Sequence, residues 1–425
     1  SLVLAETEGF SLVWPGIAFA VIITAAIILL PVLKKGGEGK AAPKIPGSVA
    51  VVAFENQTGD PKYDTMRKVI PSLLITNLEN TGLFQVSTWE RMRDVLGQMG
   101  RKGIDLVDGD VGFDFCRHEG VAFIVVGSFS KLGETFVTEF KLLDPDTRKI
   151  VRTAAARGTG EGSILNTHID ELSRLIAQGM GVGGQKLEST HMAVAELTTR
   201  STDAYAAYLQ GMEHLNKLEE PEARRFFEKA IDLDPEFAVA YLQLGQTLER
   251  EGNWERVRTA YQRAKELSGR APEKERLLIE ARYAQRVERN RSQAVALYRE
   301  LAAKYPKEKD IRVALGNILM GSDPDAAIAE FQSALALDPD FGLALNQLAF
   351  TLVGKGDYAG GQAALERYVA VAPREFNPLD SLGLVLFLRG RYDEAIDKYK
   401  KAMAINSTLG EELPIAYMLA LQEDY

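Results

Sequence analysis

The stretch Ala223 to Pro235 (ARRFFEKAIDLDP) decides the fold of the C-terminal half of the chain. It has alanine, phenylalanine, alanine and proline at its first, fifth, eighth and last positions, and similar sets recur toward the C-terminus. The repeat keeps its register, because Gly211 and Gly245 lie 34 positions apart, as do Pro339 and Pro373. A period of this length is typical of helical hairpins that stack into a solenoid.

These positions resemble the signature of the tetratricopeptide repeat, a pair of helices in which a small residue at the crossing lets two backbones approach. The resemblance covers residues 201–425 and implies about six repeats followed by a capping helix, roughly Glu411 to Leu421. The third repeat departs from the pattern, because Arg282 stands in the place of the glycine. The sequence therefore predicts an all-α solenoid with an extended concave surface.

The resemblance also implies which residues line that concave surface, since certain positions of the first helix of each repeat do so in this family. No lysine or arginine that could clamp a C-terminal carboxylate stands at these positions, so we expect an amphipathic helix or an apolar extended segment of another protein as the ligand. The alternative is that the N-terminal half of the chain fills the groove. The candidate groove residues are Tyr205, Tyr208, Met212, Leu242, Val313, Asn317, Met320, Leu343, Asn346, Phe350, Leu384 and Phe387.

The N-terminal part contains one long uncharged stretch. Ser11 to Leu33 has no charged residue and is long enough to cross the hydrocarbon core as a helix. Acidic residues precede it and no small-residue cleavage site follows, which favours a retained span over a secretory signal peptide. The sequence therefore predicts a single-pass protein of a bacterial inner (plasma) membrane. Lys34 and Lys35 favour a cytoplasmic solenoid, whereas the resemblance described next favours the periplasm, so the side stays open.

A second domain is expected between this stretch and the solenoid. Short β-branched runs such as Val49 to Phe54 and Thr135 to Leu143 predict strands. Together with the helix around Leu73 and the run Phe123 to Ser128, they are similar to the domain shared by TolB and by CsgG- and FlgO-like envelope proteins, which implies a small α+β domain. The sequence thus predicts a multidomain chain with a flank (1–10), a transmembrane helix (11–33), a linker (34–47), the α+β domain (48–182), a hinge (183–200) and the solenoid (201–425).

Candidate sites for chemistry are weak. The four histidines are far apart in the sequence, Cys116 is the only cysteine, and Gly179 to Lys186 lacks the spacing of a phosphate-binding loop. The formal net charge of −9 argues against nucleic acid as a general partner. We therefore expect no catalytic residue, cofactor or metal, and no small-molecule substrate.

Together these features predict a non-catalytic, membrane-anchored scaffold or accessory subunit that assembles proteins of a bacterial membrane or envelope complex. The order of span, second domain and repeats also resembles the C-terminal region of bacterial receptor serine/threonine kinases and adenylate cyclases. One alternative is therefore the sensory or regulatory half of such an enzyme, with the catalytic domain upstream of Ser1. A further alternative is a component of envelope secretion.

Overall fold

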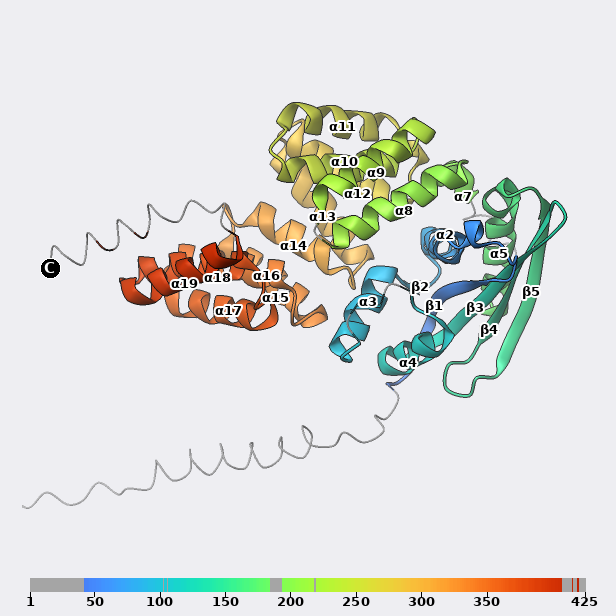
Figure 1. Cartoon of the computed structure of the whole chain (residues 1–425), viewed down its shortest axis with the longest axis horizontal. Helices are drawn as coiled ribbons and strands as arrows, with labels where there is room; N and C mark the ends of the chain where they lie inside the picture. The colour runs from blue at the N-terminus through green and yellow to red at the C-terminus, as the bar shows by residue number, and fades with distance from the viewer. Residues whose placement is uncertain are drawn as a thin grey trace, which may run out of the picture.

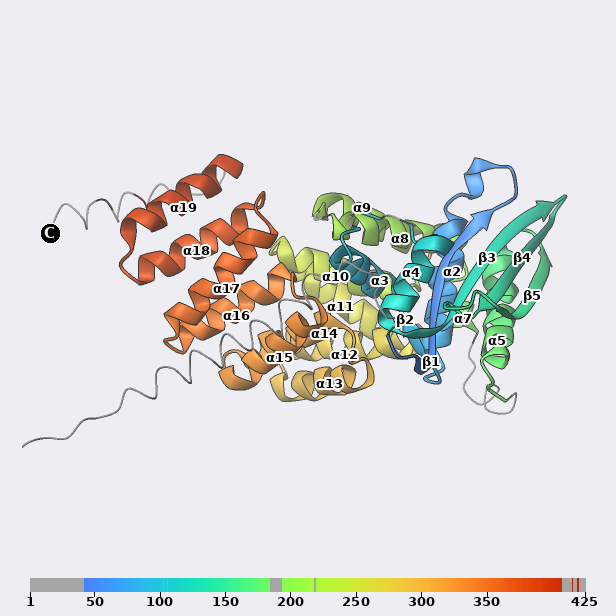
Figure 2. The same cartoon turned by 90° about the horizontal axis from the view of Figure 1, so that it is seen from below.

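The computed structural model describes residues 42–101, 103–104, 106–183, 193–217 and 219–406, together with positions 415 and 419. The described chain forms a small α/β domain followed by a solenoid of helix pairs. Figure 1 shows the α/β domain lying against the first helix pairs, while the last pairs extend away from it. Figure 2, turned by 90°, shows the same separation between the sheet and the final helices.

A five-stranded mixed sheet forms the centre of the α/β domain. Its order is β2-β1-β3-β4-β5, in which β1 is parallel to β2 and β3, and β3, β4 and β5 are antiparallel neighbours. Strand β1, which has a parallel neighbour on each side, is buried over Val49 to Val52, which explains its continuous apolar run. Gly133, with φ +59°, provides the turn between β3 and β4. The strands are β1 (Ile45–Asn56), β2 (Gln85–Ser87), β3 (Val121–Leu132), β4 (Thr135–Leu143) and β5 (Ile150–Thr159).

Four α-helices of the described residues pack around this sheet or follow its strands. α2 (Met66–Asn80) and α5 (Ile169–Gly179) contact each other; α2 packs on β1, and α5 packs on β4 and β5. α4 (Gly109–Glu119) packs on β1 and β3, where Gly112 approaches Val52 too closely for a side chain to fit. α3 (Trp89–Gln98) follows β2 directly and extends toward the solenoid (Figure 1). The short helix α7 (Val194–Leu197) leads into the first repeat.

The solenoid consists of six helix pairs among the described residues. Proline follows the second helix of most pairs, which ends that helix because proline lacks the N–H group. Contacts between consecutive helices run unbroken from the first pair to the last. The pairs are α8 (Thr202–Asn216) with α9 (Glu220–Leu233), α10 (Ala238–Arg250) with α11 (Trp254–Glu266), α12 (Glu273–Arg286) with α13 (Arg291–Lys304), α14 (Lys309–Leu319) with α15 (Pro324–Leu337), α16 (Gly342–Gly354) with α17 (Tyr358–Val371), and α18 (Phe376–Leu388) with α19 (Tyr392–Ile405).

The hydrophobic core shows how the two parts are joined. One continuous cluster of buried side chains runs from the sheet, for example Val49, through Tyr205 in the first repeat to Ile279 in the third. Two further clusters stabilise the third to fifth repeats and the fifth to sixth repeats. The α/β domain and the first repeats therefore share one core instead of being linked only by the chain between them.

The structure corrects the predicted fold class. Among the described residues, no helix is long and apolar enough to cross a bilayer. The longest described helices, α2 and α8, have 15 residues each, whereas a span needs about 20. The fold class is therefore an all-helical solenoid joined to a small α/β domain, and the prediction of a single-pass inner-membrane protein is withdrawn. The stretch Ser11 to Leu33, which carried that prediction, lies outside the described residues, as does most of the predicted capping helix.

Candidate protein-binding surface

Close packing of glycine against an aromatic ring builds the helix pairs. A methyl group on Gly245 would lie 2.6 Å from Cε1 of Tyr261, so the two backbones can approach only because glycine has no side chain. The third repeat has Arg282 in this place, and the fifth combines Ala349 with the buried Leu365. The glycine and aromatic pairs at this crossing are Gly211 with Phe227, Gly245 with Tyr261, Gly316 with Phe331, and Gly383 with Tyr399, and in the fifth repeat Gly342 at the start of α16 packs against Tyr368.

The first helices of the repeats line the inner side of the solenoid. First helices of successive repeats contact one another, as α14 does with α16 and α16 with α18. Such contacts are expected where a curved stack is most crowded, which is its concave side. All twelve predicted groove residues belong to these first helices or directly follow one.

In the first repeats the α/β domain occupies the inner surface. Tyr205 is only 4% exposed, and it lines a hollow together with Tyr208 and Met212, opposite side chains of α2 and α3. Burial raises the pKa of both tyrosine hydroxyls. Leu242 and Val313 of later repeats are also buried. These five predicted groove residues therefore contribute to packing within the chain.

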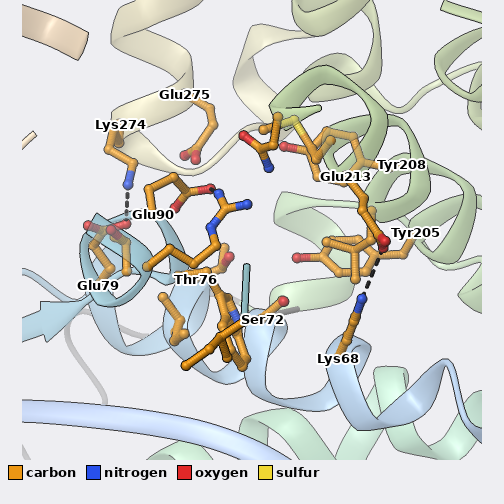
Figure 3. A pocket seen from close by; sticks show the side chains of 18 residues that line it. Lys68, Ser72, Thr76, Glu79, Glu90, Tyr205, Tyr208, Glu213, Lys274 and Glu275 are labelled. Carbon is orange, nitrogen blue, oxygen red and sulfur yellow. Dashed lines mark hydrogen bonds and ion pairs between the residues drawn. The ribbon is translucent and has the colours of Figure 1, made fainter. Parts of the chain in front are cut away.

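Ion pairs tie the α/β domain to three inner helices. Lys68 of α2 pairs with Glu213 of α8 at 2.9 Å, and Lys274 of α12 pairs with Glu79 of α2 at 2.8 Å (Figure 3). Further along the solenoid, Lys309 of α14 lies 2.7 Å from Asp94 of α3. The α/β domain thus contacts the solenoid at three points that are far apart in sequence.

Hydrogen bonds to the solenoid backbone extend this interface. Arg91 and Gln98 of α3 both donate to the carbonyl oxygen of Leu337, at 2.9 and 3.1 Å, and so reach the end of α15. The backbone N–H of Glu273 donates to Oδ1 of Asn80 at the start of α12. The sequence did not predict these contacts, because polar side chains near the ends of helices carry no periodic signal.

The inner surface of the last two repeats is different. Leu343 of α16 is 42% exposed and Leu384 of α18 is 39% exposed, and the two helices are neighbours. Phe350 and Phe387 on the same helices are half-buried, and the ring of Phe387 packs 5.9 Å from that of Tyr392. We call Leu343, Phe350, Leu384 and Phe387 the distal apolar surface.

Amides lie close to this surface in the fold. Asn317 on α14 is exposed, whereas Asn346 on α16 is half-buried, as is Met320 after the end of α14. The side-chain oxygen of Asn346 is buried and accepts no hydrogen bond from any described residue. A buried acceptor without a donor is costly, and because the protein covers this oxygen, an N–H group of a ligand can reach it only after the amide of Asn346 turns outward.

The histidines and the cysteine that were candidates for catalysis or metal binding pack against other side chains of the fold. His168 is buried and hydrogen-bonded to Thr138 at 2.9 Å, and His214 stacks on Phe226. Cys116 is buried, and burial raises the pKa of its thiol well above the ordinary value. Within the described ranges, no group of three or more histidine, cysteine, aspartate or glutamate residues could hold a metal ion.

Family comparison agrees with the repeat pattern. Models of the tetratricopeptide repeat match residues 226–259, 280–340 and 346–408. The C-terminal half of the chain therefore contains tetratricopeptide repeats, which generally serve as non-catalytic modules for protein–protein interaction. A search of curated protein sequences gave no significant match.

Solved structures with similar helix pairs are distant. A chain of the APC/C hetero-tetramer Cut9–Hcn1 is 21% identical, with 51% of this chain and 42% of that chain covered and a TM-score of 0.41. PilW, a type IV pilus biogenesis factor, is 15% identical over 51% of this chain and 99% of its own, with a TM-score of 0.41. YrrB, described as a tetratricopeptide repeat protein with an unusual peptide-binding site, is 20% identical over 47% of this chain and 97% of its own, with a TM-score of 0.29.

Proposed function

We propose that these tetratricopeptide repeats make the chain a protein-interaction scaffold that binds an apolar segment of a partner protein on the distal apolar surface. The observation that carries the proposal is a difference between equivalent sites along one solenoid. Tyr205 near the start of α8 is buried under the α/β domain, whereas Leu343, at the corresponding place in α16, is 42% exposed. Large exposed apolar side chains on adjacent helices are typical of a surface that another molecule covers.

The chemistry of this surface favours an extended segment over a helix. A helix has already satisfied its backbone N–H groups internally, whereas an extended chain presents free ones. If the amide of the half-buried Asn346 turns outward, its oxygen can accept a hydrogen bond from such a group, while Leu343 and Leu384 contact apolar side chains of the segment. The partner is therefore a protein with an exposed, uncharged and extended apolar stretch.

The α/β domain has a different part in this proposal. It occupies the first repeats through Lys68, Lys274 and Lys309, and so leaves only the end of the groove for a partner. We keep its resemblance to the TolB, CsgG and FlgO domain as a hypothesis based on sequence. The role as a subunit of a larger assembly is likewise a proposal, and it rests on the repeats.

A matched pair of leucine variants tests the binding surface. A library of displayed peptides is selected against the whole protein and against Leu343→Asp/Leu384→Asp. The control is Leu233→Asp on the outer helix α9, where the leucine is 43% exposed. All three leucines are at the surface, so stability should change by no more than about 0.5 kcal/mol per site.

We expect apolar peptides to be enriched on the unaltered protein and on the control, and to be lost on the double variant. Equal enrichment on all three proteins, or none on any, would reject the proposed surface. Ile415 packs against the same terminal core, so the selection is repeated on a chain that ends at residue 406. If peptides bind only the shortened chain, the occupant is the C-terminal segment of the protein itself and not a partner.

A further inference from the structure

A cavity of about 190 Å³ lies at the junction between the α/β domain and the solenoid. It shares no lining residue with the distal apolar surface and is bounded by α2, α3, α8 and α12 (Figure 3). Its volume is below the roughly 300–1,000 Å³ typical of sites for drug-sized ligands, so it suits a smaller molecule. The polar and aromatic residues that line it include Lys68, Ser72, Thr76, Glu79, Trp89, Glu90, Arg93, Tyr205, Tyr208, Glu213, Lys274 and Glu275.

The charges in this cavity are unequal. Glu79, Glu90, Glu213 and Glu275 are four carboxyl groups, set against three cations. Two of those cations already form ion pairs. Lys68 lies 2.9 Å from Glu213, and Lys274 lies 2.8 Å from Glu79. The third, Arg93, lies 3.8 Å from Glu90 and is a third exposed. The lining therefore keeps one carboxyl group in excess.

Glu275 is the carboxyl group of this lining that has no ion-pair partner among the described residues, although its own backbone N–H group stabilises its charged form. It forms no ion pair with any residue in the described part of the chain, although it lies next to Lys274 in the first turn of α12. Burial raises the pKa of Glu275 to about 7, the charges of Glu79 and Glu90 add to that rise, and the charge of Lys274 opposes it. An additional positive charge in the cavity would stabilise the ionised form of Glu275.

The aromatic lining fits a cation of a particular kind. In Figure 3, the hydroxyl groups of Tyr205 and Tyr208 on α8 and the carboxyl group of Glu275 on α12 point into the same space. Trp89 of α3 lines the cavity as well. Aromatic rings attract organic cations through their faces, and hydroxyl oxygens accept hydrogen bonds from an ammonium group. A metal ion is disfavoured, since the described acidic residues form no cluster with the spacing of metal ligands.

We infer that this cavity is a binding site for a small aliphatic primary amine, whose ammonium group pairs with Glu275 and lies among Tyr205, Tyr208 and Trp89. Because the lining comes from both the α/β domain and the solenoid, the bound amine would strengthen their contact. The alternative is that Glu275 is only an acidic residue in the first turn of α12, where negative charge is favourable in any helix. The inference is independent of the distal apolar surface and can fail or succeed without it.

The test uses butylammonium chloride as the probe and the whole protein as the target. Isothermal titration at slightly alkaline pH measures binding, and hydrogen exchange measures protection of α3 and the start of α12. Butan-1-ol has the same chain without the charge, and sodium chloride controls for ionic strength. The variants are Glu275→Gln, Tyr208→Leu and Glu288→Gln, the last at an exposed position of the same charge beyond the end of α12.

We expect saturable binding of butylammonium, protection of α3 and α12, and a loss of affinity of at least about tenfold in Glu275→Gln, which is the effect of one charge-assisted hydrogen bond. Tyr208→Leu should also weaken binding, and Glu288→Gln should not. Glu275→Gln removes a charge that burial disfavours, so its melting temperature should be no lower than that of the unaltered protein, and loss of binding there cannot be ascribed to misfolding. Equal binding of butan-1-ol, equal binding by Glu275→Gln, or no saturable binding would each overturn the inference.

Discussion

Replacement of Lys309 by methionine should loosen the α/β domain from the fourth repeat. The ammonium group of Lys309 lies between Asp94 of α3, at 2.7 Å, and Asp338 after α15, at 2.6 Å. The side chains of Lys309 and Asp94 are only 14% and 20% exposed. Burial raises the pKa of Asp94 and Lys309 opposes that rise, so the variant leaves Asp94 buried without its main cation.

The magnitude follows from this partial burial. Removing one member of a fully buried pair costs about 3–5 kcal/mol, whereas an exposed pair contributes about 0–1 kcal/mol. Because water still reaches these side chains, we expect the contact between α3 and α14 to weaken by about 2–3 kcal/mol. Methionine keeps the apolar stem, so the change reports chiefly on the charge.

Hydrogen exchange measures the effect where it should arise. Amides of α3 should exchange about 30- to 150-fold faster in Lys309→Met, since about 1.4 kcal/mol corresponds to a factor of ten, while α19 should not change. The matched control is Lys355→Met, because the partner of Lys355, Asp325, is 80% exposed. A second variant, Asp94→Asn in the Lys309→Met background, should restore much of the protection. Equal exchange of α3 in Lys309→Met and Lys355→Met would refute the reasoning.

Three further predictions concern packing, pH and reactivity. Gly245→Ala places a methyl group 2.6 Å from the ring of Tyr261. Overpacking outweighs the gain in helix propensity, so the free energy of unfolding measured by urea denaturation should fall by about 1–2 kcal/mol. Gly354 has open space around it, so Gly354→Ala should not lower the free energy of unfolding. Burial raises the pKa of Glu308 from 4.5 to about 7, so the folded state binds this proton more tightly than the unfolded state does. The free energy of unfolding should therefore fall by about 3 kcal/mol as pH rises through that range, and a fall of the same size in Glu308→Gln would contradict this. Cys116 is buried with a raised thiol pKa, so a thiol reagent should label it in urea but not in the native protein, and rapid native labelling would show that the site opens.

The repeats could be predicted from the sequence because their packing rule is local and periodic. Gly245 and Tyr261 belong to one helix pair, and the same combination returns in three other repeats at multiples of about 34 residues, so the spacing predicts the contact. The position of Leu343 and Leu384 on first helices also follows from the repeat, but their exposure does not, because Tyr205 at the place that corresponds to Leu343 is buried. For the same reason, Arg282 stands out in the sequence as a departure from the pattern.

The contact between the two domains could not be predicted in this way. Lys68, Lys274 and Lys309 belong to three helices, and each finds its partner more than a hundred residues away. Nothing in the local pattern distinguishes such a lysine from one that faces water. The available signal was the size of Tyr205 and Tyr208, because two large aromatic residues at groove positions of one repeat indicate that something covers them.

The α/β domain also has a mechanical consequence for the solenoid. Each repeat of a solenoid contacts only its neighbours, so small rotations between neighbouring repeats add up to bending of the whole stack. Here the α/β domain contacts α8, α12, α14 and the end of α15. These contacts restrict rotation among the first four repeats. Flexing is then confined to the last two repeats, which carry Leu343 and Leu384. The last two repeats can then rotate relative to the first four. A partner that binds Leu343 and Leu384 can change the angle of these two repeats without distorting the part of the solenoid that the α/β domain holds.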